Sequence, residues 1–269
     1  MNTKALLVGI NKYPDPRNSL RGCINDILDM EYFISEKNKV YAKEHIKKLT
    51  DQQATKKGII TQIKWLLEGA QPGDQLLFHY SGHGAQAPTI HPAIEPDGLD
   101  EIICPYDFNG SEATMFRDKE FASLFATIPK GVHFVWVSDS CHAEDLSRDP
   151  KQADEPILYR NFISADFEKA SLAPTLNSTP IIEQPTTPLN GALLSACASD
   201  QLSADAIINN RFNGAFTHYL IENLMTYGNT KPMELIVHLV NVDLKHNGYE
   251  QNAQSEGLLA NKTFFLPQI

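Results

Sequence analysis

Three apolar runs, each followed by polar chain, constrain the fold of this sequence most strongly. They lie at residues 4–10, 75–80 and 132–137 and are nearly continuous, as expected of strands that are buried on both faces. Between the first two runs, apolar residues recur at helical spacing within residues 20–36 and 59–67. This alternation predicts an α/β fold with a mostly parallel sheet and helices on both faces.

The rest of the chain yields further elements by the same reasoning. We expect loops where proline and charged residues gather, and strands or helices where apolar periodicity resumes. The expected elements are a strand at 46–50, a loop at 85–100, a helix at 118–127, a long loop at 143–188, a strand at 191–197, helical faces at 216–225 and 235–240, and a last strand at 262–266.

Composition and charge exclude several classes of protein. The net charge of −10 would repel phosphates, and no local basic patch offsets it, so we expect no nucleic-acid or membrane partner. The first apolar run is too short for a signal peptide or a membrane span, which predicts a cytoplasmic location. The four cysteines lie far apart with no CxxC pair, so we expect reduced thiols and no zinc site.

Chemically active residue types follow two of the strands at the point where each strand ends. His83 and Gly84 follow the strand at 75–80, and Cys141 follows the strand at 132–137. Because the carboxyl ends of parallel strands share one edge of a sheet, these side chains are expected to meet. A thiol, an imidazole and the backbone N–H groups of Gly84 and Cys141 would supply a nucleophile, a proton carrier and oxyanion donors. The alternative is a buried structural cysteine and a turn histidine, but their matching positions favour a site.

The motifs around these residues resemble those of metacaspases and orthocaspases, the caspase-like cysteine peptidases outside animals. YSGHG at 80–84 and DSCH at 139–142 match the histidine and cysteine motifs of that family. LRGCIND at 20–26, LSACASDQLSAD at 194–205 and NGAFT at 213–217 match further blocks in the same order. The resemblance therefore covers nearly the whole chain.

This resemblance implies a caspase-like fold, a six-stranded and mostly parallel sheet flanked by helices on both faces. It divides one peptidase domain, 1–269, into a large catalytic segment at 1–142, an intervening loop at 143–188 and a small segment at 189–269. It also implies cleavage after arginine or lysine. In the family, residues matching Cys23, Asp26, Ser81 and Asp139 line the pocket for that basic side chain. Two carboxylates there would meet a guanidinium and repel an aspartate.

Calcium, which many metacaspases require, fits this sequence poorly. The acidic cluster at 95–101 offers oxygen ligands, and Asp100 and Asp118 align with ligand positions of the family. However, Arg117 and Arg148 stand where further acids are expected, and two cations would oppose binding unless a nearby aspartate substitutes. The sequence therefore assigns no metal ligand and no required cofactor. A solvated acidic loop explains the cluster better than a calcium site does.

The resemblance and the residues together predict a cysteine endopeptidase whose substrate is a protein or peptide with Arg or Lys at the cleaved position. Basic residues in the intervening loop, Arg148, Lys151, Arg160 and Lys169, suggest self-cleavage, although an ordinary surface loop would also contain them. The alternatives are a catalytically silent caspase-like interaction module and an acidic calcium-binding regulator. We expect any regulatory partner to lie on another chain.

Overall fold

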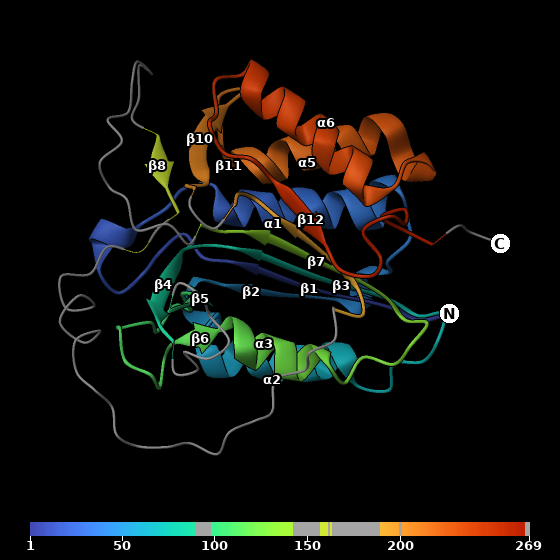
Figure 1. Cartoon of the computed structure of the whole chain (residues 1–269), viewed down its shortest axis with the longest axis horizontal. Helices are drawn as coiled ribbons and strands as arrows, with labels where there is room; N and C mark the ends of the chain where they lie inside the picture. Colours follow the sequence, from blue (N-terminus) through green and yellow to red (C-terminus); the bar gives the residue numbers. More distant parts are fainter. Residues whose placement is uncertain (90–97, 142–156, 161, 163–188, 199–200, 267–269) are drawn as a thin grey trace.

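A six-stranded sheet forms the centre of the molecule (Figure 1). The computed structural model describes residues 1–89, 98–141, 157–160, 162, 189–198 and 201–266. The strand order is β12-β9-β7-β3-β1-β2, and every pair is parallel except β12 with β9. The strands are β1 (Thr3–Gly9), β2 (Ile46–Thr50), β3 (Gln75–Ser81), β7 (His133–Asp139), β9 (Ala192–Ser195) and β12 (Gln254–Glu256). This confirms the predicted α/β class and the mostly parallel sheet.

Helices cover both faces of this sheet, as predicted. On one face lie α1 (Cys23–Glu31), α5 (Ala215–Tyr227) and α6 (Met233–His246), and on the other lie α2 (Lys56–Leu67) and α3 (Asp118–Phe125) (Figure 1). Each layer has its own apolar core, and both cores contact the central strands. Short helical turns are η1 (Pro16–Asn18), η2 (Tyr32–Lys37), η3 (Lys43–His45), η4 (Asp51–Gln53) and η5 (Gly228–Thr230).

Local sequence explains why these elements form. Strand β1 buries five consecutive residues from Ala5 to Gly9, which fits a strand covered on both faces. Helix α2 begins after Thr55, whose side chain accepts a hydrogen bond from the Gly58 N–H, and it turns Ile59 and Ile63 toward the core. The two cores therefore follow from burial patterns that are readable in the sequence.

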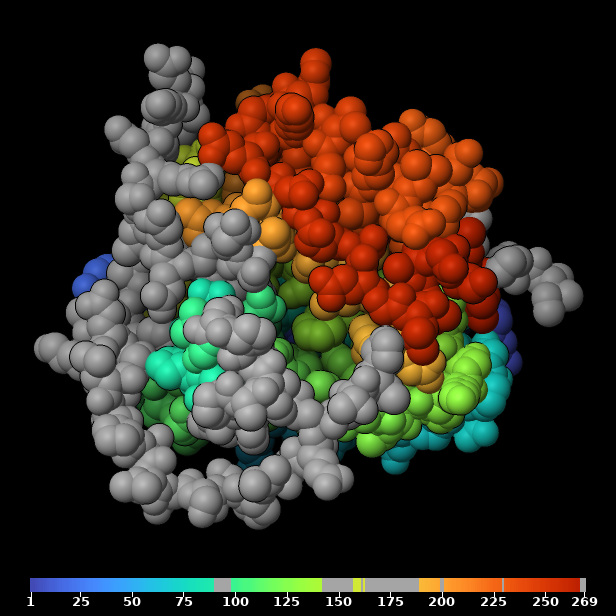
Figure 2. Space-filling model, viewed as in Figure 1, coloured from blue at the N-terminus to red at the C-terminus, as the bar shows by residue number. Residues whose placement is uncertain are grey.

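Two small three-stranded sheets adjoin the central one. The first contains β4 (Gly84–Pro88), β5 (Leu99–Ile103) and β6 (Phe116–Arg117). The second contains β8 (Leu158–Tyr159), β10 (Ala204–Ile208) and β11 (Arg211–Gly214). The C-terminal part of the chain, orange to red, gathers on one side of the molecule (Figure 2).

Two predictions about the elements were wrong. Both ends of the loop expected at 85–100 belong to strands, because β4 and β5 pair with each other. A proline and polar residues in these strands hide the apolar alternation that would have predicted them. The last strand expected at 262–266 forms only an isolated bridge between Thr263 and Pro232, because Phe264 and Phe265 are buried in the core instead. The predicted loop at 143–188 lies outside the described residues except for 157–160 and 162. Within the described part of the chain, no helix has the length and apolar character to span a membrane.

Candidate active site

His83 and Cys141 lie at the same edge of the central sheet. Strands β3 and β7 are parallel neighbours, and Ser81 pairs with Asp139 at their carboxyl ends. His83 and Cys141 each follow two residues after this pair, and the Gly82 N–H donates to the Asp139 carbonyl at 3.2 Å. The pairing register therefore brings both residues to the same end of the sheet, where α/β proteins gather their chemistry.

The imidazole of His83 is held in one orientation. Its Nε2 lies 2.8 Å from the carbonyl oxygen of Asn18, at the end of η1. Because a carbonyl can only accept, Nε2 carries the proton and Nδ1 keeps its lone pair. Nδ1 has no hydrogen-bond partner among the described residues. Burial lowers the pKa of His83 to about 4, so the ring is neutral and can accept a proton at Nδ1.

Cys141 is fully buried and has a free thiol. Burial raises the pKa of Cys141 to about 12, and hydrogen bonds from the backbones of Ser203 and Arg160 act in the opposite direction. The thiol is therefore protonated in this state of the protein. A reaction at Cys141 would have to remove that proton as the sulfur attacks.

The four residues expected to form a pocket for a basic side chain lie together. Asp26, in the first turn of α1, accepts a hydrogen bond from the Ser81 hydroxyl at 2.7 Å, and both residues are fully buried. Cys23 is buried at the start of the same helix, and the Ser81 hydroxyl hydrogen-bonds with its thiol. Asp139 is buried at the end of β7. Its carboxylate accepts hydrogen bonds from the hydroxyls of Ser203 and Thr217.

Arg160 of the same chain fills this pocket. Its side chain is fully buried, and its Nη2 lies 2.7 Å from Asp26 Oδ2 and 3.2 Å from Asp205 Oδ1. Its Nη1 lies 3.0 Å from Asp139 Oδ1 and donates to the Ser81 hydroxyl at 2.8 Å. The two terminal nitrogens of one guanidinium are thus shared among three carboxylates and a hydroxyl.

The backbone of Arg160 is bound as firmly as its side chain. The residues before it form β8, which pairs antiparallel with β10, and the Arg160 N–H donates to the Ser203 carbonyl at 3.0 Å. The Arg160 carbonyl accepts a hydrogen bond of 2.9 Å from the N–H of Gly84, one of the two predicted oxyanion donors. The Arg160 backbone also lies close enough to Cys141 and His83 to shift the pKa of each. The carbonyl of Arg160 is therefore held at the Gly84 N–H, close to His83 and Cys141.

Three further residues contribute to this site, and the sequence alone assigned a function to none of them. Asp205 lies in the LSACASDQLSAD block, and its carboxylate also accepts from the N–H groups of Arg21 and Gly22. Asn18 orients His83 through a backbone carbonyl, for which no side-chain signal exists in the sequence. Gly214 lies against the guanidinium, because a Cβ there would lie 2.6 Å from Arg160 Nη2. Its place in the NGAFT block is the signal that could have identified it.

The residues aligned with the calcium position do not fit a calcium ion. Asp100 is fully buried, and its two oxygens lie 2.7 Å from Arg117 Nη1 and 2.6 Å from Lys119 Nζ. Burial acts to raise the pKa of Asp100, but Lys119, Thr89 and Arg117 together hold it below its ordinary value. Asp118 pairs with Lys119 as well, at 3.1 Å. Two fixed cations thus occupy the carboxylate that would bind the metal. Nowhere in the described ranges do three or more His, Cys, Asp or Glu residues form a group that could hold one.

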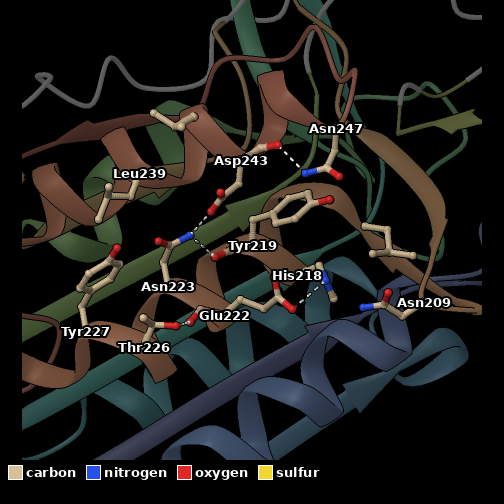
Figure 3. Close-up of a pocket in the computed structure, with 12 residues that line it drawn as sticks. Asn209, His218, Tyr219, Glu222, Asn223, Thr226, Tyr227, Leu239, Asp243 and Asn247 are labelled. Carbon is tan, nitrogen blue, oxygen red and sulfur yellow. Dashed lines mark hydrogen bonds and ion pairs between the residues drawn. The ribbon is translucent and has the colours of Figure 1, made fainter.

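A hollow of about 610 Å³ lies elsewhere, between β10, α5 and α6 (Figure 3). Its polar side chains contact one another. Asn223 donates to Asp243 at 2.6 Å, and His218 lies 3.5 Å from Glu222. None of its lining residues belongs to the site around Arg160, so the candidate chemistry lies at the sheet edge and not in this hollow.

Comparison with known proteins agrees with the motifs. The profile described as "Metacaspase, peptidase C14 domain" matches residues 3–148. The chain belongs to the metacaspase family. It is 30% identical to Metacaspase-1A of Aspergillus niger over 88% of this chain and 65% of the relative. It is 31% identical to Metacaspase-1 of Meyerozyma guilliermondii over 82% of this chain and 61% of the relative. The chain thus spans less than two thirds of the length of these metacaspases.

A solved structure supports the fold independently. A Geobacter sulfurreducens protein of known crystal structure superimposes with a TM-score of 0.69, covering 95% of this chain and 92% of that one, at 24% identity. The similarity concerns the arrangement of the sheet and helices. Together with the metacaspase profile, it agrees with the caspase-like fold that the motifs imply.

Proposed function

We propose that this metacaspase chain is a cysteine endopeptidase that cleaves peptide bonds after arginine or lysine. The observation that carries the proposal is the position of Arg160, whose guanidinium fills a pocket of three carboxylates while its carbonyl accepts from the Gly84 N–H. A substrate with a basic side chain would bind in the same way. The family membership supports the peptidase class, and the pocket supports the choice of residue.

The chemistry follows from the neutral forms of Cys141 and His83. Nδ1 of His83 takes the thiol proton as the sulfur of Cys141 attacks the carbonyl carbon, and the Asn18 carbonyl stabilises the resulting imidazolium through Nε2. The oxyanion is held by the N–H groups of Gly84 and Cys141. His83 then gives its proton to the departing amine, and water hydrolyses the thioester to restore both groups.

Specificity for a basic residue follows from charge and geometry. An aspartate in this pocket would meet the carboxylates of Asp26, Asp139 and Asp205 without a counter-charge, at a high cost in a buried site. A guanidinium offers two terminal nitrogens that reach separate partners, whereas a lysine ammonium offers a single point of charge. We therefore expect arginine to be preferred over lysine.

The same geometry selects one bond for self-cleavage. Of the four basic residues in the intervening loop, only Arg160 is among the described residues, and it lies in the pocket. The proposed cut is the Arg160–Asn161 bond. Until the segment leaves, Arg160 occupies the pocket that a second substrate would need. A catalytically silent interaction module would instead use Arg160 as a permanent internal ion pair.

No calcium is needed for this proposed activity. Arg117 and Lys119 already supply two positive charges to Asp100, at the small sheet whose strand β4 begins at Gly84. Those ion pairs connect β5, β6 and the start of α3, as a bound cation would. A cytoplasmic location and a regulatory partner on another chain stay predictions from the sequence.

Peptide cleavage tests the proposal directly. Fluorogenic peptides ending in Arg, Lys or Asp are incubated with the purified chain beside the variants Cys141→Ala and His83→Ala. We expect cleavage after Arg and Lys, none after Asp, and no activity in either variant. Cleavage that survives in Cys141→Ala would overturn the assignment. An inactive wild type that contains no internal cut would favour the interaction module.

A further inference from the structure

Two residues beyond Arg160, the side chain of Phe162 packs against three aromatic rings. Its ring centroid lies 4.8 Å from that of Phe108, 5.7 Å from that of Tyr13 and 5.8 Å from that of His83. The planes meet at 82°, 75° and 89°, which is the edge-to-face geometry that aromatic rings prefer. Phe162 is half-buried there, against the core that lies beneath α2 and α3.

The backbone places this side chain with respect to the proposed scissile bond. The Phe162 N–H donates to the Gly84 carbonyl at 3.2 Å, and the Gly84 N–H donates to the Arg160 carbonyl at 2.9 Å. One residue, Gly84, therefore binds the chain on both sides of the Arg160–Asn161 bond. A peptide that lies across the site in this register places its second residue after the cut against these three aromatic rings.

The three rings are also held by hydrogen bonds with other parts of the protein. The Tyr13 hydroxyl donates to the Cys104 carbonyl at 3.2 Å and accepts from the His83 N–H at 3.0 Å. Phe108 is buried at 3% exposure and closes a turn onto Pro105. None of these hydrogen bonds involves Phe162, so we expect the rings to keep their arrangement and accept another apolar ring when the segment that contains Phe162 leaves.

We propose that the rings of Tyr13, Phe108 and His83 form a binding subsite on the leaving-group side, which selects an aromatic side chain two residues after the cleaved arginine. This inference rests on the proposed peptidase function and adds a second determinant of substrate choice. An apolar ring gains edge-to-face contacts there, while a carboxylate loses its hydration without gaining a partner. The subsite also places an apolar wall next to the imidazole that moves the proton.

Matched peptides test the subsite. The series Leu-Tyr-Arg-Asn-X-Ile keeps the chain's own sequence around the cut, and X is Phe, Leu, Ala or Glu in otherwise identical peptides. We expect kcat/KM for X = Phe to exceed that for Ala about tenfold, with Leu between them and Glu lowest. In the variant Phe108→Ala, the ratio of Phe to Ala should fall at least threefold. Changing the third residue after the cut is the control and should change the rate little.

Self-cleavage provides a second readout that does not depend on Phe108→Ala folding correctly. Phe162→Ala should slow the cut at Arg160 about tenfold, while Phe162→Tyr should retain it, as followed by intact mass over time. Equal rates for all peptides in the wild type, together with an unchanged cut in Phe162→Ala, would overturn the subsite and leave the peptidase proposal standing. Absence of cleavage of every peptide and of the chain itself would overturn both.

Discussion

Replacement of Arg160 by glutamine separates the two roles that the structure gives this side chain. Glutamine keeps a polar end group but removes the cation that Asp26, Asp139 and Asp205 share. At the cleavage site, a glutamine side chain offers the acidic pocket no charge, so the cut after this position should be lost. Arg160 is also an ion-pair partner, and its replacement leaves three buried carboxylates without their counter-charge.

The expected loss of stability can be estimated from the contacts. Breaking a buried ion pair by removing one partner costs about 3–5 kcal/mol, and water entering the vacated pocket or a proton on one carboxylate reduces this. Burial already raises the pKa of Asp26 to about 7 with the guanidinium present, and the pKa rises further when the cation is gone. In the folded variant the Asp26 carboxyl therefore stays protonated above pH 7, whereas in the unfolded chain it loses its proton near pH 4. Because the folded state holds the extra proton, the stability of the variant falls as the pH rises from 4 to beyond 7.

Urea unfolding at pH 6 and pH 8 measures this effect. Both chains carry Cys141→Ala, so that neither is cut during the experiment. Arg160→Gln should lower the free energy of unfolding by about 3 kcal/mol at pH 8 and by less at pH 6. Equal stability of the two chains at pH 8 would refute the view that Arg160 neutralises a buried acidic pocket.

Intact mass measures the cut with Cys141 restored. The wild type should yield the fragments 1–160 and 161–269, Arg160→Lys the same fragments more slowly, and Arg160→Gln the whole chain. Arg148→Gln and Lys169→Gln are matched controls, since each removes one basic residue from the same intervening loop, and both should be cut at Arg160. Fragments that persist in Arg160→Gln and vanish in either control would refute the assignment.

Three further predictions concern calcium, Asp205 and His79. Cleavage of an arginyl peptide should differ less than twofold between EGTA and millimolar calcium because Arg117 and Lys119 neutralise Asp100, and loss of activity in EGTA would contradict this. Asp205→Asn should lower kcat/KM for an arginyl peptide about tenfold to a hundredfold and reduce the preference over lysine, as steady-state rates on the two peptides would show. Burial lowers the pKa of His79 to about 4 in the folded protein. Between pH 4 and 6.5 the unfolded chain therefore binds a proton at His79 that the folded chain does not bind. The free energy of unfolding should fall by about 3 kcal/mol as the pH drops through that window. Urea midpoints against pH, compared with those of His79→Leu, measure this loss, and identical profiles would contradict it.

The central part of the fold could be predicted because its signals are local. Continuous apolar runs identify β1, β3 and β7, and these strands need no partner in order to be recognised. Strand β12 has the sequence Gln-Ser-Glu and becomes a strand only by pairing with β9. Strand β4 contains a glycine and a proline and is defined by its pairing with β5. Pairing between distant segments leaves no periodicity in either segment alone.

The same division applies to the candidate site. The motifs indicated Cys23, Asp26, Ser81 and Asp139, and these four residues lie together. The orientation of His83 depends on a backbone carbonyl, which every residue has, so no side-chain pattern could reveal it. Arg160 was one of four basic residues in a polar loop. Nothing in its neighbourhood of the sequence distinguishes it from the other three.

What distinguishes Arg160 is complementarity with residues far away in the chain. Desolvated carboxylates at 26, 139 and 205 repel one another, so an empty pocket is the least stable form of this site. The buried negative charge that would select a basic substrate therefore also favours binding of a basic residue of the chain itself in the pocket. Selectivity for arginine and occupation of the pocket by Arg160 then have one physical cause. It follows that substitutions which remove negative charge from the pocket, such as Asp205→Asn, should weaken the binding of the Arg160 side chain and the binding of a basic substrate together.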